Sequence, residues 1–326
     1  MKDIKKLIFG ILGIIVCANV FAQEVAPPTI TNYDFQDQSC VNTVSDNGKW
    51  AVSFGPGTSN ASMYTNARLI NIETGEVTVL GLEYDEDTPV SCMASDVTDD
   101  GMVVGEYKCR PATWTKAGGW KTLKLPAGWG GGFLERVTPD GKYAVGRASY
   151  GYSETQLLYD LANGELLETP GIPTKGASGE TFQQMRFTNI TADGRYVEGI
   201  GDFSYTWNTV SFIYDREKKT CVRPGFNDDG TPVYSGVTGL EGTFSADGKW
   251  YAGSAYIVKG EDDYRCPFRY NISTGEFVVY ESTTGTNYSF ITVDNEGIMY
   301  GSPASEVTPA HINAEREHRV SEEQAK

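Results

Sequence analysis

The sequence VTPDGKYAVGRA at 137–148 decides the fold, because related sequences recur along most of the chain. Its Asp-Gly pair stands between two short apolar runs. Such a pair is the strongest short-range signal for a β-hairpin, since both residues tolerate the backbone angles of a tight turn. The copies are VSDNGKWAVSFG at 44–55, VTDDGMVVGEY at 97–107, ITADGRYVEGIG at 190–201, FSADGKWYAGSA at 244–255 and a weaker TVDNEGIMYGS at 292–302. The chain is therefore built from repeats of one hairpin-containing unit.

The turn glycines of these copies lie 53, 40, 53, 54 and 49 residues apart, within the range of propeller blades and their loops. They are Gly48, Gly101, Gly141, Gly194, Gly248 and Gly297. A small residue returns four or five positions later, at Ser53, Gly105, Gly146, Gly199, Gly253 and Gly301. Small residues at this place fit strands that pack closely on neighbouring sheets.

A second hairpin follows each of the first five copies. Each consists of an apolar strand, a polar turn and a short apolar strand, at 67–80, 112–123, 156–167, 211–222 and 267–279. The fourth of these lacks a turn glycine and has Lys218-Lys219 instead. Two hairpins per unit predict a four-stranded antiparallel sheet, which buries both faces only when units stack radially. We therefore predict an all-β protein with very little helix, a single β-propeller of about six four-stranded blades.

Two other β architectures compete with this interpretation. A β-solenoid coil is shorter than a 50-residue unit with two hairpins, and a two-sheet sandwich does not require six equivalent turns. The last blade is predicted to be either incomplete or closed by an N-terminal strand at 29–35, which precedes the first copy and lacks a partner. Residues 309–312 align with 111–114 and suggest a third strand in that blade.

The repeat resembles those of extracellular HAF-type proteins and the propeller repeats of TolB-like exported proteins. The resemblance rests on Ser-x-Asp-Gly-Lys-x-x-Val-Gly, followed by Ala or Phe-x-Trp or Tyr and by Gly-x-x-x-x-Leu, and it covers residues 44–301. It implies a propeller and export, and it transfers no catalytic residue, because such proteins are mostly of unassigned role. It also leaves open that the chain is a shortened member of a longer family.

The N-terminal residues predict a signal peptide at 1–22. Three lysines precede the ten-residue apolar run 7–16, and Val20-Phe21-Ala22 resembles a cleavage site. Ten apolar residues are fewer than the roughly 20 that span a bilayer, which disfavours the alternative of an uncleaved anchor. We expect an exported protein, periplasmic, cell-surface or extracellular, with the propeller at 23–313 and a poorly ordered charged tail at 314–326.

The net charge of −16 argues against nucleic acid as a partner, since such a chain repels phosphate backbones. No segment after the signal has the 18 consecutive apolar residues of a membrane span. The cysteines beyond the signal are Cys40, Cys92, Cys109, Cys221 and Cys266, and their spacings match no zinc motif, so buried thiols are the favoured interpretation. We expect a monomer without a cofactor or a metal ion.

Catalytic motifs are weak in this sequence. The only histidines are His311 and His318, close to the C-terminal end, so a Ser-His-Asp or Cys-His arrangement within the repeats is excluded. The repeat aspartates recur as equivalent copies, which indicates that they cap turns: Asp46, Asp100, Asp140, Asp193 and Asp247. We predict no catalytic residue, although the many carboxylates leave open a carboxylate-dependent glycoside hydrolase or lyase.

The loops opposite the Asp-Gly turns carry aromatic residues outside the strand pattern, which we call the long-loop face. Loops on a rigid scaffold commonly carry function, and aromatic rings suit stacking on sugars or clamping a peptide. The predicted ligand-binding residues are Trp129, Phe133, Tyr152, Tyr205, Trp207, Tyr234, Tyr264 and Arg147. We predict a binding module for a glycan, a peptide or an envelope protein; the other interpretations are that the rings only cover their own loops, or that the role is structural.

Overall fold

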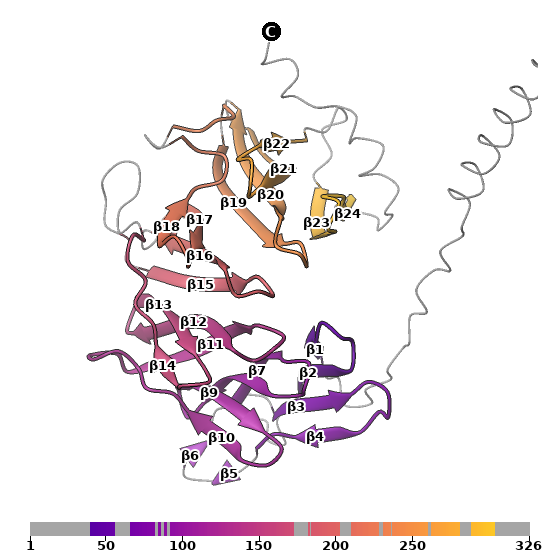
Figure 1. The fold of residues 1–326 in the computed structure, drawn as a ribbon, viewed down its shortest axis with the longest axis vertical. Coiled ribbons are helices and arrows are strands. Elements are labelled where there is room, and N and C mark those ends of the chain that lie inside the picture. Colours follow the sequence, from indigo (N-terminus) through magenta and orange to yellow (C-terminus); the bar gives the residue numbers. More distant parts are fainter. Residues whose placement is uncertain are drawn as a thin grey trace, which may run out of the picture. The chain divides into compact units, whose positions relative to one another are not determined.

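The computed structural model of the chain describes an all-β protein, as the repeats predicted (Figure 1). The described residues are 40–55, 66–81, 84–85, 88–89, 92–172, 182, 184–202, 210–227, 231–235, 237–259, 262–280 and 288–303. They contain strands, turns and no helix. The signal at 1–22, the strand at 29–35, the strand at 309–312, the tail at 314–326 and both histidines lie outside them.

Each repeat forms one antiparallel blade of consecutive strands, and three of these blades are separate sheets of four strands. Blade 1 contains β1 (Cys40–Val44), β2 (Trp50–Gly55), β3 (Asn66–Asn71) and β4 (Val77–Val79). Blade 2 contains β7 (Cys92–Val97), β8 (Val103–Tyr107), β9 (Arg110–Thr115) and β10 (Gly119–Thr122). Blade 5 contains β19 (Val237–Phe244), β20 (Trp250–Lys259), β21 (Asp262–Asn271) and β22 (Phe277–Val279).

Blades 3 and 4 share one continuous sheet, because a single parallel bridge between Glu154 and Gln184 joins them. Blade 3 contains β11 (Gly131–Val137), β12 (Tyr143–Tyr150), β13 (Ser153–Asp160) and β14 (Glu165–Leu166). Blade 4 contains β15 (Gln184–Ile190), β16 (Tyr196–Asp202), β17 (Val210–Asp215) and β18 (Thr220–Val222). All five second hairpins thus lie where the sequence predicted them.

The sixth repeat is described as the pair β23 (Tyr288–Val293) and β24 (Met299–Pro303), so blade 6 has its first hairpin. A small hairpin that the sequence did not predict, β5 (Tyr84–Asp85) with β6 (Thr88–Pro89), lies between blades 1 and 2 in the chain.

The repeated turns owe their shape to a local hydrogen-bond pattern. In blade 3, Thr138 Oγ1 donates to Asp140 Oδ1 at 2.6 Å, and the same carboxylate oxygen accepts from Lys142 N at 3.0 Å. Gly141 follows at φ 70°, which glycine adopts without steric cost. The predicted capping role of the repeat aspartates is confirmed for Asp140, and the same bonds recur around Asp193 and Asp247.

One member of the predicted aspartate set needs correction. In blade 1 the capping residue is Asn47, whose Oδ1 accepts from Ser45 Oγ at 2.8 Å and from Lys49 N at 3.0 Å. Asp46 precedes it and is equivalent to Asp99 of blade 2, which is not a cap. The error arose because both Asp and Asn satisfy the turn, so counting only aspartates misplaced the register by one residue.

The hydrophobic core lies between consecutive blades. Each of five core clusters combines buried residues from two neighbouring blades. Adjacent residues of one strand serve different clusters: Val103 packs with blade 1 and Val104 with blade 3, as the alternation of side chains along a strand requires. Trp114 is buried, and Trp50 and Trp250 pack half-buried on the clusters.

Consecutive Asp-Gly turns also bond directly to one another, which places them on the same side of the sheets. Asn47 N donates to Asp99 Oδ1 at 2.8 Å, and Asp99 N donates to the Pro139 carbonyl at 3.0 Å. Between blades 5 and 6, Asp247 N donates to Asn295 Oδ1 at 2.9 Å. The loops at the opposite ends of the strands are therefore grouped as well.

Candidate functional site

The long-loop end of blade 3, formed by β11 and by the hairpin that joins β12 to β13, carries three of the predicted ligand-binding residues. Phe133 on β11 pairs with Arg147 on β12, and the Arg147 guanidinium lies 4.3 Å from the centroid of the Phe133 ring. Tyr152 lies in the turn between β12 and β13. The structure therefore unites Phe133, Arg147 and Tyr152 at the long-loop end of blade 3.

Four charged side chains, which we call the blade 3–4 charge cluster, surround this arginine: Glu135, Arg147, Glu154 and Arg186. Arg147 contacts Glu135 at 3.6 Å and Glu154 at 3.2 Å, and Arg186 contacts the other oxygen of Glu154 at 3.3 Å. Their side chains are between 17% and 26% exposed. The cluster carries two charges of each sign and mixes strong donors with strong acceptors, a combination suited to hydroxyl groups.

Burial and neighbouring charges have opposite effects on the pKa of a carboxyl group in this cluster. Burial raises the pKa of the Glu135 carboxyl, and the positive charges of Arg147, Arg136 and Arg186 act against that rise. Partly buried pairs of this kind are weak contributors to stability but fix the orientation of their groups. The arrangement holds two carboxylates and two guanidinium groups in place before any ligand arrives.

Two tyrosines stand out from the tip of the same hairpin. The side chains of Tyr150 and Tyr152 are 68% and 79% exposed. Their backbone is anchored, because Gln184 Nε2 donates to the Tyr152 carbonyl at 3.0 Å and Tyr150 closes the β12–β13 ladder against Ser153. Large aromatic rings presented to solvent on a fixed hairpin are available for stacking.

The remaining predicted residues lie elsewhere. Trp129 is half-buried against the core cluster of blades 2 and 3, and Tyr234 is 8% exposed within that of blades 4 and 5. Tyr264 lies on β21, where its backbone pairs with Ile257. Tyr205 and Trp207 lie outside the described residues.

A second set of polar residues, which sequence reasoning missed, occupies one repeated position. It lies five residues before each turn glycine and is Thr43, Asp96, Arg136, Asn189, Thr243 and Thr292. The position is polar in every repeat although the next residue is always apolar, a signal that alignment of the repeats contains. In five blades it follows a β-bulge of the first strand, which re-aims the side chain.

The first five of these residues line one polar cavity of about 190 Å³. Much of their bonding is internal. Asp96 accepts from Val97 N at 3.0 Å and from Val137 N at 2.9 Å, and Asn189 Nδ2 donates to Thr243 Oγ1 at 2.9 Å. Burial raises the pKa of Asp96 to about 6, and the Arg136 charge limits the rise. These polar residues therefore join the first strands of neighbouring blades.

Glu198 on β16 is a buried carboxyl group at a repeat position that is apolar in other blades. It is 4% exposed and takes a position that holds Val52, Val104 and Val145 in blades 1 to 3. Tyr251 Oη of blade 5 donates to its Oε1 at 2.5 Å. Burial raises the pKa of Glu198 to about 7, with hydrogen bonds and the Arg136 charge acting in the opposite direction.

Two searches of the described residues bear on other functions. No helix there has the length and apolar character needed to cross a bilayer. No three His, Cys, Asp or Glu side chains of that part of the chain gather as ligands of a metal ion would.

Comparison with known proteins finds no matching family model and no matching curated protein. Solved structures do match. Hydrazine synthase from Kuenenia stuttgartiensis is 16% identical with a TM-score of 0.51, over 85% of this chain and 81% of that chain. TolB from Acinetobacter baumannii is 15% identical with a TM-score of 0.44, over 75% of this chain, which spans 56% of TolB.

The tricorn protease also matches, at 12% identity and a TM-score of 0.45, over 78% of this chain and 23% of that chain. At such identities the likeness concerns the fold alone. The predicted fold class is confirmed: the chain is a β-propeller of consecutive antiparallel blades, and its match to hydrazine synthase covers most of both chains. A fold does not determine a function, so the function has to be argued from the residues of this chain.

Proposed function

We propose that this chain is an exported binding module that recognises a glycan at the long-loop end of blade 3. The observation that carries the proposal is the pair of exposed tyrosines, Tyr150 at 68% and Tyr152 at 79%, on the hairpin that also holds Arg147 and Glu154 of the charge cluster. Aromatic faces stack on the apolar faces of sugar rings, and the arginines and glutamates supply partners for the hydroxyl groups.

Two further features support a binding role over a catalytic one. The carboxylates of the charge cluster lie 3.2 to 3.6 Å from arginine nitrogens, which fixes the orientation of their oxygens as hydrogen-bond acceptors. The hairpin is fixed by the eight-residue ladder between β12 and β13 and by the Gln184 bond, so little ordering is required on binding.

The test is affinity electrophoresis of the full chain in gels containing soluble polysaccharides: xylan, mannan, β-glucan, alginate and polygalacturonate. We expect retardation by at least one neutral polysaccharide. The double variant Tyr150→Ala/Tyr152→Ala is expected to weaken it at least about tenfold, since stacking on an aromatic ring contributes on the order of 1 kcal/mol or more per ring.

The matched control is Tyr300→Ala, which removes another exposed tyrosine ring, 37% exposed on β24 in blade 6. This variant is expected to migrate as the unaltered protein does. Absence of retardation in every gel, or equal retardation of the double variant and the control, would refute glycan binding at this hairpin. A peptide or protein ligand would then be the remaining interpretation of the long-loop face.

The alternative function, a carboxylate-dependent glycoside hydrolase or lyase, draws on the raised pKa of Asp96 and Glu198. Carboxyl groups with pKa values near 6 and 7 are suited to proton transfer at neutral pH. Incubation with the same polysaccharides distinguishes the two functions. Formation of reducing ends or of an unsaturated product absorbing in the ultraviolet would favour catalysis, and intact polysaccharide with retained binding favours a binding module.

A further inference from the structure

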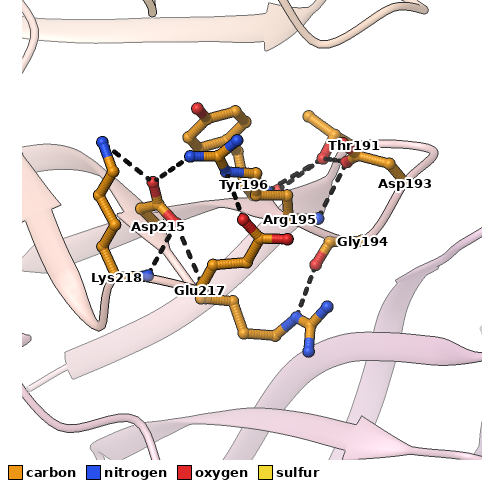
Figure 2. A network of polar contacts seen from close by, with 9 residues as sticks. Thr191, Asp193, Gly194, Arg195, Tyr196, Asp215, Glu217 and Lys218 are labelled. Atoms are coloured by element: carbon orange, nitrogen blue, oxygen red, sulfur yellow. Dashed lines mark hydrogen bonds and ion pairs between the residues drawn. The ribbon is translucent and has the colours of Figure 1, made fainter.

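Several junctions between blades share an arrangement in which an aromatic ring meets the turn glycine of the next blade. At the junction of blades 3 and 4, Gly194 lies against the ring of Tyr143, and a Cβ on Gly194 would come within 2.5 Å of it. The Arg216 guanidinium covers the same ring at 3.9 Å from its centroid. Arg216 Nε also donates to the Gly194 carbonyl at 2.7 Å, one of the contacts drawn in Figure 2.

The junction of blades 5 and 6 repeats the arrangement with different residues. Gly297 lies against the indole of Trp250, where an added Cβ would come within 2.6 Å. The Arg269 guanidinium lies 5.0 Å from the Trp250 ring, and its Nη1 donates to the Gly297 carbonyl at 3.3 Å. Arg269 is 6% exposed, so the protein places a buried guanidinium between ring and carbonyl.

The junction of blades 1 and 2 has the ring and the glycine but not the arginine. Gly101 lies against Trp50, with an added Cβ 3.0 Å from the indole. The segment LINIETG at 69–75 is equivalent to RYNISTG at 269–275, so Leu69 stands where blade 5 has Arg269. Among the described residues no cation is recorded over Trp50, and a cavity of about 170 Å³ lies beside it.

The lining of this cavity contains two carboxylates, those of Asp100 and Glu76, and one cation, Lys116. Asp100 contributes a carboxylate whose Oδ1 accepts from Thr98 Oγ1 and Met102 N, while its Oδ2 accepts no hydrogen bond from the described residues. Glu76 also lines the cavity and contacts Lys116 at 3.9 Å, with side chains 62% and 80% exposed. Such an exposed pair rearranges at little cost, and the net charge of −16 attracts cations at long range.

We propose that this cavity, the Trp50 cavity, binds the guanidinium group of an external ligand. The group would stack on the Trp50 indole, donate to the Gly101 carbonyl and pair with the Asp100 carboxylate, as Arg269 and Arg216 stack and donate within the protein. A guanidinium keeps its charge at every physiological pH and is planar, which suits a ring on one side and a fork of acceptors on the other.

The test measures binding to the full chain by calorimetry and by the fluorescence of its tryptophans. The probes are N-acetyl-Gly-Arg-Gly-amide, free L-arginine and, as the uncharged isostere, N-acetyl-Gly-citrulline-Gly-amide. We expect saturable binding of the arginine tripeptide, at least about tenfold tighter than the citrulline tripeptide, because stacking and pairing both require the charge. Binding of free arginine as well would identify a small molecule as sufficient; binding of the tripeptide alone would indicate a protein partner.

Two variants locate the binding. Leu69→Arg places the chain's own guanidinium where blade 5 has Arg269, so binding of the arginine tripeptide should be lost while the thermal midpoint is maintained. Asp100→Asn keeps the turn, because Asn47 is the natural residue at that position in blade 1, and it should weaken binding about tenfold. Thermal unfolding of each variant checks that it folds.

The proposal is overturned if neither arginine probe binds, if the citrulline tripeptide binds equally well, or if Asp100→Asn binds as the unaltered chain does. It does not depend on the glycan function, because the Trp50 cavity lies at the junction of blades 1 and 2 and on the Asp-Gly turn of blade 2. The Tyr150→Ala/Tyr152→Ala variant should bind the arginine tripeptide normally.

Discussion

Substitution of Glu198 by glutamine is expected to change how stability depends on pH. Glutamine has the same shape, and its amide oxygen can accept the hydrogen bond that Tyr251 Oη gives Glu198 at 2.5 Å. The substitution therefore removes the ionisation of the side chain, and a hydrogen bond lost from Thr188 or from the Gly242 backbone adds a cost that does not vary with pH. The effect arises because Glu198 is 4% exposed and its carboxylate has lost nearly all contact with water.

The magnitude follows from the shift of the pKa. Burial raises the pKa of Glu198 from 4.5 in the unfolded chain to about 7 in the folded protein. A group with a raised folded pKa stabilises the protein fully below its unfolded pKa, and this stabilisation is lost as the pH rises through the folded value. At 1.36 kcal/mol per unit, the loss between pH 4.5 and pH 8 is roughly 3 kcal/mol.

The assay is urea unfolding of the unaltered chain and of Glu198→Gln at pH 4.5, 6 and 8. Stability changes from other groups, including Asp96 with its pKa of about 6, are common to both proteins and cancel in the difference. We expect the variant to gain roughly 3 kcal/mol relative to the unaltered chain between pH 4.5 and pH 8. A difference that stays constant with pH would refute the reasoning, since it would mean that Glu198 keeps an ordinary pKa.

Three further substitutions, the first with a matched control, test the geometry of the repeats. Gly194→Ala should lower the free energy of unfolding in urea by about 2 to 4 kcal/mol, because φ is 71° and the new Cβ would lie 2.5 Å from the Tyr143 ring. The control Gly151→Ala, at φ 59° with no atom near the new Cβ, should lower it by only about 1 kcal/mol. Equal losses of stability would contradict the close packing at Gly194. Lys219→Gly should stabilise the protein by about 0.5 to 1 kcal/mol, since φ is 57°, and a lower unfolding midpoint would contradict this. Arg269→Leu should open a second guanidinium site, so calorimetry with the arginine tripeptide should show two sites in place of one.

The blade architecture could be predicted because its signals are local. A positive φ at Gly48 and its equivalents needs a residue without a Cβ, and the flanking strands need apolar residues, so both features recur in the sequence at fixed intervals. The second hairpins follow the same logic. Even the turn without glycine was placed correctly, because Lys219 adopts the positive φ that glycine adopts at Gly75 and Gly275.

The candidate site could be predicted only in part, because burial depends on neighbours from other blades. The sequence identified Phe133, Arg147 and Tyr152, which the structure brings to one end of blade 3. The sequence also predicted Tyr234 as a ligand-binding residue, although its side chain is buried between blades 4 and 5. A tyrosine in a loop looks the same in sequence whether its ring faces solvent or the adjoining blade.

The repeats allow residues at equivalent positions of different blades to be compared, so a residue that differs from its equivalents can be recognised in the sequence. Glu198 is informative since the equivalent residues in the first three blades are valines, and Arg269 is informative since its equivalents in blades 1, 3 and 4 are the apolar Leu69, Leu158 and Ile213. Departures of this kind have a physical cost, a buried carboxyl in one case and a buried guanidinium in the other. Selection keeps such costs where they serve a purpose. The residues that depart from the repeat therefore indicate where this propeller has a function that the fold alone does not require.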